Sequence, residues 1–300
     1  MLNNKQLIFI IGAPRSGTTW LHTVLASHPE VASTNAELTV FNRYVAPLVK
    51  QFEFEQKPIQ QGKWRQGLPH LWSRDRFDQT IKAFIEEIYS SLTILPGHKI
   101  ILDKHPDYSF HTGLIHYYLP NAKFLHLIRD GRDVASSWHK AWKKLGFGNP
   151  VFSGACLDWI NYKDSARKAK ELGPDKYIEV RYENLMVDFN KEIKGILDFC
   201  NVSSSPELID ALASKNTGEE NMISSPDKTI KYAERKKGEP IWKRTLTKEE
   251  QFIANKYLAK DLIKEGYETS ANWGLNNLDS AIMYLKLKTK GIARRVMKSA

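Results

Sequence analysis

The chain has 300 residues, of which 42% are hydrophobic and 26% charged, and this fits one large α/β domain or at most two small ones. Its two cysteines, Cys156 and Cys200, exclude a disulfide framework, so we expect a reducing compartment. The net charge of +10 favours anionic partners, among them nucleotide phosphates, acidic acceptors, nucleic acid and acidic membranes. No apolar run approaches the roughly 18–20 residues that cross a bilayer, and no cleavage site follows the run 7–11, so we expect a soluble, cytoplasmic protein.

The first twenty-six residues predict a strand, a loop and a helix. Residues 7–11 are β-branched, aromatic or leucine, residues 12–17 form a glycine-bounded loop, and residues 18–26 place their apolar side chains on one side of a helix. Further strands are predicted at 99–102, 123–128 and 177–180. Helices are predicted at 78–92, 130–144, 156–172, 190–199, 206–214 and 247–264. This alternation predicts an α/β fold, a parallel sheet with helices on both faces.

A single domain is predicted over residues 1–275, and three segments depart from the alternation of strands and helices, two within this domain and one after it. Residues 38–98 are rich in aromatic side chains and are interpreted as an insertion that walls an acceptor pocket or packs as a helical excursion. Residues 214–242 are polar and predict a long loop of the functional kind. Residues 276–300 form a basic tail, which either contacts an anionic membrane surface or packs on its own domain.

The loop after the first strand has the glycine spacing of a P-loop. Gly12 and Gly17 enclose four residues, but Thr18 stands where a P-loop has its lysine. Backbone N–H groups at a helix start, glycines that permit close approach and threonine hydroxyls all favour an anion. Arg15 supplies a cation from within the loop. The loop therefore indicates a phosphate-type ligand, and the missing lysine argues against ordinary ATP hydrolysis.

A second candidate anion site follows the 123–128 strand. Arg129 lies at the end of that strand, where ligands bind in parallel α/β sheets, and Ser137 follows eight residues later in the next helix. One arginine and one serine at this spacing suit a single phosphate. Arg132, near the same helix start, is interpreted as a surface residue.

Together, the segments Pro14–Trp20 and Leu127–Trp138 resemble the nucleotide-binding segments of the PAPS-dependent sulfotransferase superfamily, which has a P-loop NTPase-like fold. PAPS is 3′-phosphoadenosine-5′-phosphosulfate. The resemblance implies that Trp20 stacks on the adenine and that Arg129 and Ser137 bind the 3′-phosphate. It assigns the 5′-phosphosulfate to Arg15, Ser16, Gly17, Thr18 and Thr19.

Two further segments resemble this family. Val180–Leu185 is similar to a Y-E-D-L segment, which implies that Tyr182 lies near the adenine. The run 235–238, followed by Trp242 and Lys243, is similar to an R-K-G…W-K loop that closes on the 3′-phosphate, with a spacing one residue shorter. The register of this loop stays open among its members Arg235, Lys236, Lys237 and Gly238.

The reaction centre needs cations and a base. Sulfuryl transfer resembles phosphoryl transfer in requiring stabilisation of the moving group and deprotonation of the acceptor. Arg15 is one cation. The segment Asp103–Tyr108 resembles the E-K-T-P-x-Y stretch of heparan-sulfate-type sulfotransferases, which implies that Lys104 contacts the sulfuryl group.

Three residues are candidate bases. Glu37 aligns with the catalytic glutamate of carbohydrate 3-O-sulfotransferases and ranks first. His105 ranks second, because it resembles the histidine of cytosolic sulfotransferases and histidine titrates near neutrality. Asp103 ranks third and takes the place of the glutamate in E-K-T-P. If none is catalytic, they are surface, polar or turn residues.

The sequence thus predicts an enzyme that moves a sulfuryl group from PAPS to a hydroxyl or amine of a small-molecule, carbohydrate or lipid acceptor, releasing 3′,5′-ADP. No metal is expected, because no His or Cys spacing supports one. No nucleic-acid partner is expected, and the oligomeric state is open. The alternatives are a P-loop nucleotide kinase and a nucleotide- or nucleic-acid-binding protein without turnover.

Overall fold

The computed structural model describes residues 5–34, 36–216, 240–271 and 273. By their contacts these divide into two compact units. Unit 1 comprises the described parts of Met1–Ile128 and Tyr162–Gly238, and unit 2 those of Arg129–Asn161 and Glu239–Ala300. The expected single domain over 1–275 stays a prediction.

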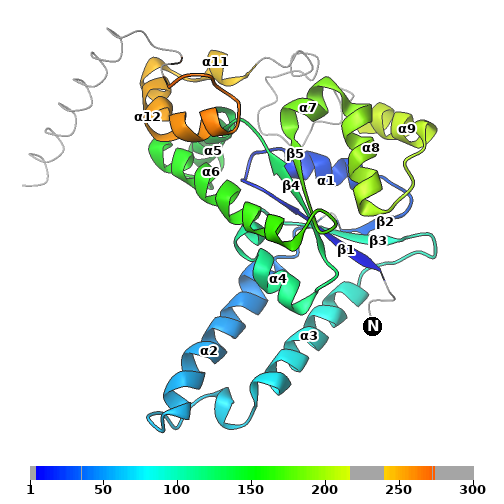
Figure 1. Ribbon diagram of the computed structural model, residues 1–300, viewed down its shortest axis with the longest axis vertical. Helices are drawn as coiled ribbons and strands as arrows, with labels where there is room; N and C mark the ends of the chain where they lie inside the picture. The colour runs from blue at the N-terminus through cyan, green and yellow to red at the C-terminus, as the bar shows by residue number, and fades with distance from the viewer. Residues whose placement is uncertain (1–4, 35, 217–239, 272, 274–300) are drawn as a thin grey trace, which may run out of the picture. The chain divides into compact units, whose positions relative to one another are not determined.

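Unit 1 is built on a five-stranded sheet in the order β2-β3-β1-β4-β5, and every adjacent pair is parallel (Figure 1). The strands are β1 (Gln6–Ile11), β2 (Val31–Ser33), β3 (Ile100–Lys104), β4 (Lys123–Ile128) and β5 (Tyr177–Arg181). The predicted parallel α/β class is confirmed. The sequence pattern missed β2, because three residues are too short to show a period.

Helices cover both faces of this sheet. They are α1 (Thr18–Ala26), α2 (Ala46–Gln60), α3 (Arg74–Ser90), α4 (Thr112–Tyr118), α7 (Tyr182–Val187), α8 (Phe189–Cys200) and α9 (Pro206–Asn216). Shorter helical turns are η1 (Val40–Val45), η2 (Leu68–His70), η3 (Pro106–Phe110) and η4 (Lys168–Leu172). Helix α6 (Phe152–Arg167) begins in unit 2 and ends in unit 1.

The sheet separates two hydrophobic clusters. Side chains alternate along β1, so that Leu7, Phe9 and Ile11 join one cluster and Ile8 and Ile10 join the other. The first cluster includes residues of η1, α2, α3 and α4, and the second includes residues of α1, α7, α8 and α9. A strand buried on both faces needs the continuous apolar run that the sequence shows.

Unit 2 is helical in its described part. It contains α5 (Gly131–Leu145), the start of α6, α11 (Trp242–Thr245) and α12 (Lys248–Lys264). Thr247 caps α12 in a capping box with Glu250, which satisfies two N–H groups at the helix start. No helix in the described part of the chain is long and apolar enough to cross a membrane.

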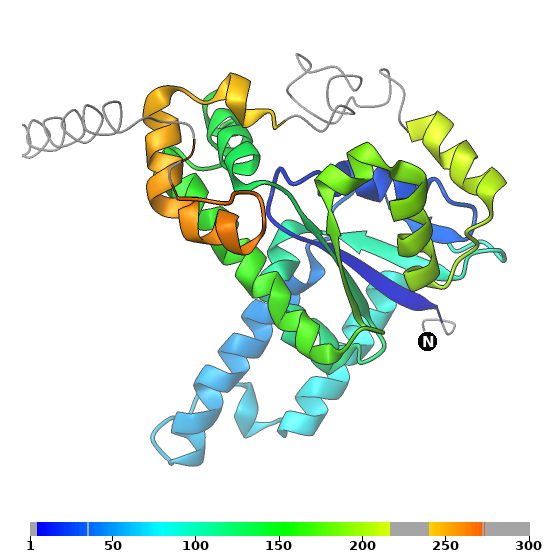
Figure 2. The same cartoon turned by 45° about the horizontal axis from the view of Figure 1, so that its top comes forward.

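The predicted insertion 38–98 folds mainly as α2 and α3, two helices joined by a loop (Figure 2). These helices are held together by Phe52 and Phe77, which are buried and stacked with ring centroids 4.1 Å apart. At the two ends of the predicted loop 214–242, α9 reaches Asn216 and α11 begins at Trp242. Its residues 217–239, like the basic tail 276–300, lie outside the described part of the chain.

We expect Phe77→Ala to lower the free energy of unfolding by about 3–5 kcal/mol, because it leaves a cavity against Phe52. Phe84→Ala, on an exposed position of the same helix α3, is the matched control and should change it by less than about 1 kcal/mol. Urea denaturation measures both values. Equal effects of the two substitutions would show that α3 is not anchored through Phe77.

Candidate functional site

The candidate site in unit 1 lies at the carboxyl ends of β1 and β3, the edge where parallel α/β sheets bind ligands. The glycine-bounded loop leaves β1 after Ile11, and Lys104 is the last residue of β3. The two strands are neighbours, with Ile10 opposite Lys104 in their register. Chain segments about ninety residues apart in sequence therefore deliver the loop and the lysine to one place.

The backbone of the loop has the shape of an anion cradle. Gly12, Arg15 and Gly17 all have positive φ, at 137°, 72° and 100°. The left-handed region is costly for arginine, and such residues concentrate at functional sites. A positive-φ residue within a turn can bring neighbouring backbone N–H groups to one side, as in known phosphate-binding nests.

Glycine is required at both ends of the loop. A Cβ on Gly12 would lie 2.4 Å from the carbonyl oxygen of Leu127, and one on Gly17 would lie 2.8 Å from the ring of Tyr182. Gly17 precedes α1 and has no side chain to cap its first N–H groups. The hydroxyl of Ser16 is buried and has no partner within the described residues. Uncapped N–H donors and an unsatisfied hydroxyl fit the phosphosulfate end of PAPS.

Lys104 connects this loop to Glu37. Its ammonium group donates a hydrogen bond to Oγ1 of Thr19 at 3.1 Å and forms a salt bridge with the Glu37 carboxylate. Lys104 is buried, whereas the side chain of Glu37 is 42% exposed. The carboxylate thus has one oxygen held by a buried cation and remains open to a ligand.

His105 lies on the other side of the same carboxylate, with its Nε2 3.4 Å from Oε2 of Glu37. The Nδ1 atom of His105 accepts a hydrogen bond from the backbone N–H of Asp107 at 3.1 Å. Because Nδ1 is used as an acceptor, a neutral His105 carries its proton on Nε2, facing Glu37. In this arrangement His105 can donate to Glu37 but has no lone pair free for an acceptor's proton.

Asp103, the third candidate base, is buried to 1% exposure. One carboxylate oxygen accepts hydrogen bonds from the hydroxyls of Tyr89 at 2.7 Å and Tyr108 at 3.0 Å, and the other accepts from the N–H of Lys104 at 2.7 Å. The hydroxyl of Tyr108 accepts in turn from the N–H of Val40 at 2.9 Å. Asp103 therefore links β3 to the segment that follows Glu37.

A cavity of about 230 Å³ opens beside Glu37 and Lys104. It is lined by Thr19, His22, Thr23, Ala26, Ser27, Ala36, Glu37, Lys104 and Lys215. The sequence analysis missed His22, although its spacing from Thr19, Thr23 and Ala26 places these residues on one face of α1. Burial, and next the charge of Lys104, lower the pKa of His22 to about 4 against the raising effect of Glu37. His22 is therefore neutral at pH 7, and its Nε2 lies 2.7 Å from Oγ of Ser33.

Two residues assigned to the adenine, Trp20 and Tyr182, lie together in unit 1. Both are buried, their ring centroids are 6.2 Å apart, and Trp20 also packs on Phe189 at 6.1 Å. Tyr182 begins α7, directly after β5, and contacts the position of Gly17. This packing is that of core aromatic residues, so stacking of Trp20 on an adenine stays a prediction.

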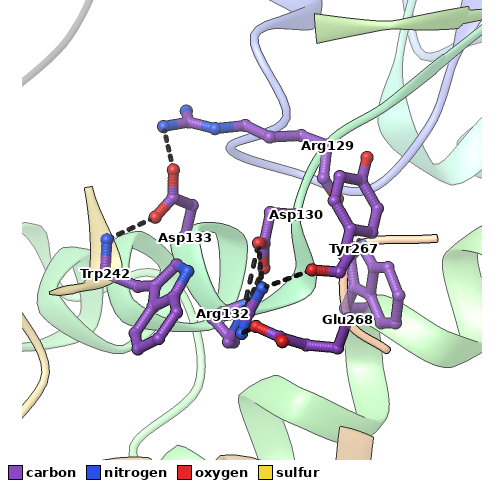
Figure 3. Close-up of polar contacts among 8 residues, drawn as sticks. Arg129, Asp130, Arg132, Asp133, Trp242, Tyr267 and Glu268 are labelled. Atoms are coloured by element: carbon purple, nitrogen blue, oxygen red, sulfur yellow. Dashed lines mark hydrogen bonds and ion pairs between the residues drawn. The ribbon is translucent and has the colours of Figure 1, made fainter. Parts of the chain in front are cut away.

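The residues assigned to the 3′-phosphate, Arg129 and Ser137, belong to unit 2. Arg129 donates to Oδ2 of Asp133 at 3.0 Å, and Oδ1 of Asp133 accepts from the N–H of Trp242 at 2.6 Å (Figure 3). Ser137 lies in the second turn of α5. Trp242, which belongs to the predicted cofactor-closing motif, is thus held beside Arg129. The other members of that motif, Arg235 to Gly238, lie outside the described residues.

Arg132 is buried, so the expectation of a surface residue was wrong. Its guanidinium is bound by Asp130 at 2.6 Å and by Glu268 (Figure 3). It lies over the rings of Trp242 at 4.1 Å and Trp273 at 4.5 Å. A guanidinium stacks well on aromatic rings while its N–H groups bond in the plane. Arg132 therefore joins α5 to the segment after α12 within unit 2.

Among the described residues, no group of three or more His, Cys, Asp or Glu could hold a metal ion.

Residues 7–206 match the model of the Sulfotransferase family, and the chain belongs to this family. A putative protein-tyrosine sulfotransferase of Caenorhabditis briggsae is 26% identical over 219 residues, 70% of this chain and 70% of that protein. Protein-tyrosine sulfotransferase 2 of Gallus gallus is 26% identical over 68% of this chain and 53% of its own length. An uncharacterized protein of Aquifex aeolicus is 26% identical over 88% of this chain, which spans only 33% of that protein.

Solved structures of sulfotransferases share the fold. Mouse SULT7A1 in complex with PAP, which is 3′,5′-ADP, has a TM-score of 0.52 and 16% identity, covering 86% of this chain and 84% of that one. The sulfotransferase domain of the Synechococcus PCC 7002 olefin synthase has a TM-score of 0.51 and 17% identity, covering 95% of each chain. At these identities the likeness shows the fold, and the predicted sulfotransferase fold is confirmed.

The buried carboxyl of Asp103 predicts a pH-dependent effect of Tyr89→Phe. Burial raises the pKa of Asp103 and the tyrosine donors lower it, so the native state loses stability as pH rises through this raised pKa. Removing one donor raises the pKa further. Tyr89→Phe should therefore lower the free energy of unfolding by about 1–3 kcal/mol, and by more at about pH 8 than at about pH 5.

Urea denaturation at the two pH values measures this difference. Tyr44→Phe, which removes the hydroxyl of an exposed tyrosine, serves as the control and should have no effect at either pH. A cost of Tyr89→Phe that is constant with pH would mean that Asp103 does not change its ionisation in this range.

Proposed function

We propose that the chain transfers a sulfuryl group from PAPS to an acceptor hydroxyl and releases 3′,5′-ADP. The observation that carries the proposal is that Lys104 contacts both Glu37 and Thr19 beside the anion loop, residues 12–17. This arrangement brings together a cation, a partly exposed carboxylate and a loop whose backbone is shaped to bind a phosphate. Sulfuryl transfer requires a cation to stabilise the moving group and a base to deprotonate the acceptor. Family membership supports the reaction class.

In this proposal the loop from Gly12 to Thr19 binds the phosphosulfate, and Arg129 with Ser137 binds the 3′-phosphate. PAPS supplies the sulfuryl group and the leaving group. Arg15 and Lys104 stabilise the negative charge on the oxygens around the sulfur. No metal is invoked, because the two side chains carry the positive charge.

Glu37 is the proposed base. Its carboxylate accepts the proton of the acceptor hydroxyl while the acceptor oxygen bonds to sulfur and the bond from sulfur to the phosphate oxygen breaks. Two observations rank Glu37 above the other candidates. His105 presents a donor rather than a lone pair to the site, and Asp103 is buried with both oxygens occupied. We infer that Asp103 positions Lys104 and the segment bearing Glu37.

The proposed acceptor is a hydroxyl compound that reaches Glu37 through the cavity beside Glu37 and Lys104. Two of the relatives are named as protein-tyrosine sulfotransferases. A relative from Mycobacterium tuberculosis, 30% identical over 42% of this chain, is named as a sulfotransferase of an omega-hydroxylated menaquinone. Both acceptors carry a hydroxyl, one phenolic and one aliphatic. A screen of acceptors should therefore include both kinds.

Binding of the product nucleotide tests the donor site without an acceptor. 3′,5′-ADP at about 100 times its dissociation constant should stabilise the protein by roughly 2.7 kcal/mol and raise Tm by several degrees. 5′-ADP, which lacks the 3′-phosphate, is the matched ligand control and should shift Tm far less. A shift with ATP and magnesium alone would replace this proposal by a nucleotide kinase.

Substitutions at the reaction centre test the assigned roles. With PAPS carrying radioactive sulfur and an acceptor from the screen, Glu37→Gln should lower kcat by about 10²–10⁴-fold, because the base is lost. Lys104→Ala should lower kcat as well while keeping the Tm shift with 3′,5′-ADP, because Lys104 acts on the transferred group. His105→Ala is the comparison for Glu37→Gln. If it lost more activity than Glu37→Gln, the base would be His105.

A further inference from the structure

The loop end of the α2–α3 hairpin is an unassigned surface of unit 1. Figures 1 and 2 show both helices extending away from the sheet and joined at their far ends. We define the hairpin tip as residues 54–72, the outer part of α2, the connecting loop and η2. The core-anchoring rings of Phe52 and Phe77 lie outside it. Apart from Trp72, which is partly buried against the first cluster, no residue of the tip belongs to that cluster or packs against it.

The tip exposes large apolar side chains. Leu71 is 79% exposed, Phe54 61%, Leu68 43% and Trp64 40%, and the rings of Phe54 and Trp64 contact each other with centroids 5.3 Å apart. Single exposed apolar residues are normal on a protein surface, but four large ones within eighteen residues, two of them in ring contact, indicate a binding surface. Tryptophan and leucine together are typical of a surface that enters the interfacial region of a bilayer.

The tip carries more basic than acidic side chains. Residues 56–73 include Lys57, Lys63 and Arg65 and no acidic residue, and all three basic side chains are exposed. The acid at the edge of the tip, Glu55, is engaged by the N–H of Leu68 at 3.2 Å and the amide of Gln51 at 2.7 Å. The exposed apolar side chains of the tip are therefore accompanied by three exposed cations and by one acid whose two oxygens accept hydrogen bonds.

We propose that the hairpin tip docks on the surface of an anionic lipid bilayer. Trp64, Leu68 and Leu71 would enter the headgroup region while the neighbouring lysine and arginine side chains contact lipid phosphates. A bilayer fits this surface better than a second copy of the chain. A symmetric pairing of two tips would place two sets of like charges against each other. The proposal concerns peripheral attachment and does not depend on the proposed catalysis.

Co-sedimentation of the full chain with large unilamellar vesicles tests the proposal. At about 0.1 M NaCl the protein should pellet with phosphatidylcholine vesicles containing phosphatidylglycerol and remain soluble with phosphatidylcholine alone. Leu71→Glu should weaken partitioning by at least about tenfold, because it replaces an inserted apolar side chain by an anion. Val187→Glu is the matched control, since Val187 is 65% exposed but lies outside the tip, and should bind like the unsubstituted chain.

The charge contribution is measured separately. Replacing Lys57, Lys63 and Arg65 together by Gln should remove the preference for phosphatidylglycerol, with about fivefold lost for each side chain. The Tm shift with 3′,5′-ADP, if present, checks that each variant is folded, and circular dichroism does so if it is absent.

Three results would overturn the proposal. One is failure to bind either kind of vesicle, and another is equal binding of the Leu71→Glu and Val187→Glu variants. The third is a dimer in light scattering that Leu71→Glu converts to a monomer, because the occupant of the tip would then be a second copy of the chain.

Discussion

The last two residues of β3 carry the polar interactions on which the site depends. Adjacent residues of a strand face opposite sides of the sheet, so that Asp103 meets Tyr89 and Tyr108 while Lys104 meets Thr19 and Glu37. Both side chains are buried, and a buried polar group is tolerated only when it is hydrogen-bonded. The two requirements, satisfied on opposite faces, fix the end of β3 between the anion loop and the segment that carries Glu37.

This arrangement explains how a partly exposed carboxylate is kept in one place. Glu37 lies in an irregular stretch before η1, where no regular hydrogen-bond ladder holds the backbone. The hydroxyl of Tyr108 bonds to the N–H of Val40, three residues further on, and to Asp103. Lys104 holds the carboxylate itself. Positioning through such supporting contacts is what lets a site on a loop reach the precision that catalysis requires.

The sequence predicted the elements whose signals are local. The apolar run of β1, the glycine spacing after it and the strand before Arg129 were all found where the structure has them. The errors and omissions concern tertiary contacts. Arg132 looked like a solvated residue at a helix start, but its partners Glu268 and Trp273 are far away in sequence. His22 was missed because a lone histidine on a helix has no meaning until Glu37 and Lys104 are placed beside it.

The sequence by itself determined the α/β class, the anion loop and the sulfotransferase family, because periodicity and motif spacing are properties of the chain that survive without its neighbours. It ranked three candidate bases, Glu37, His105 and Asp103, by resemblance and residue type but excluded none of them. The tertiary structure separated them by burial and hydrogen bonding. It engages both oxygens of Asp103, turns the Nε2 proton of His105 toward the site and leaves Glu37 partly open. Residue type fixes what a group can do, but only the fold decides which of its atoms meets an acceptor.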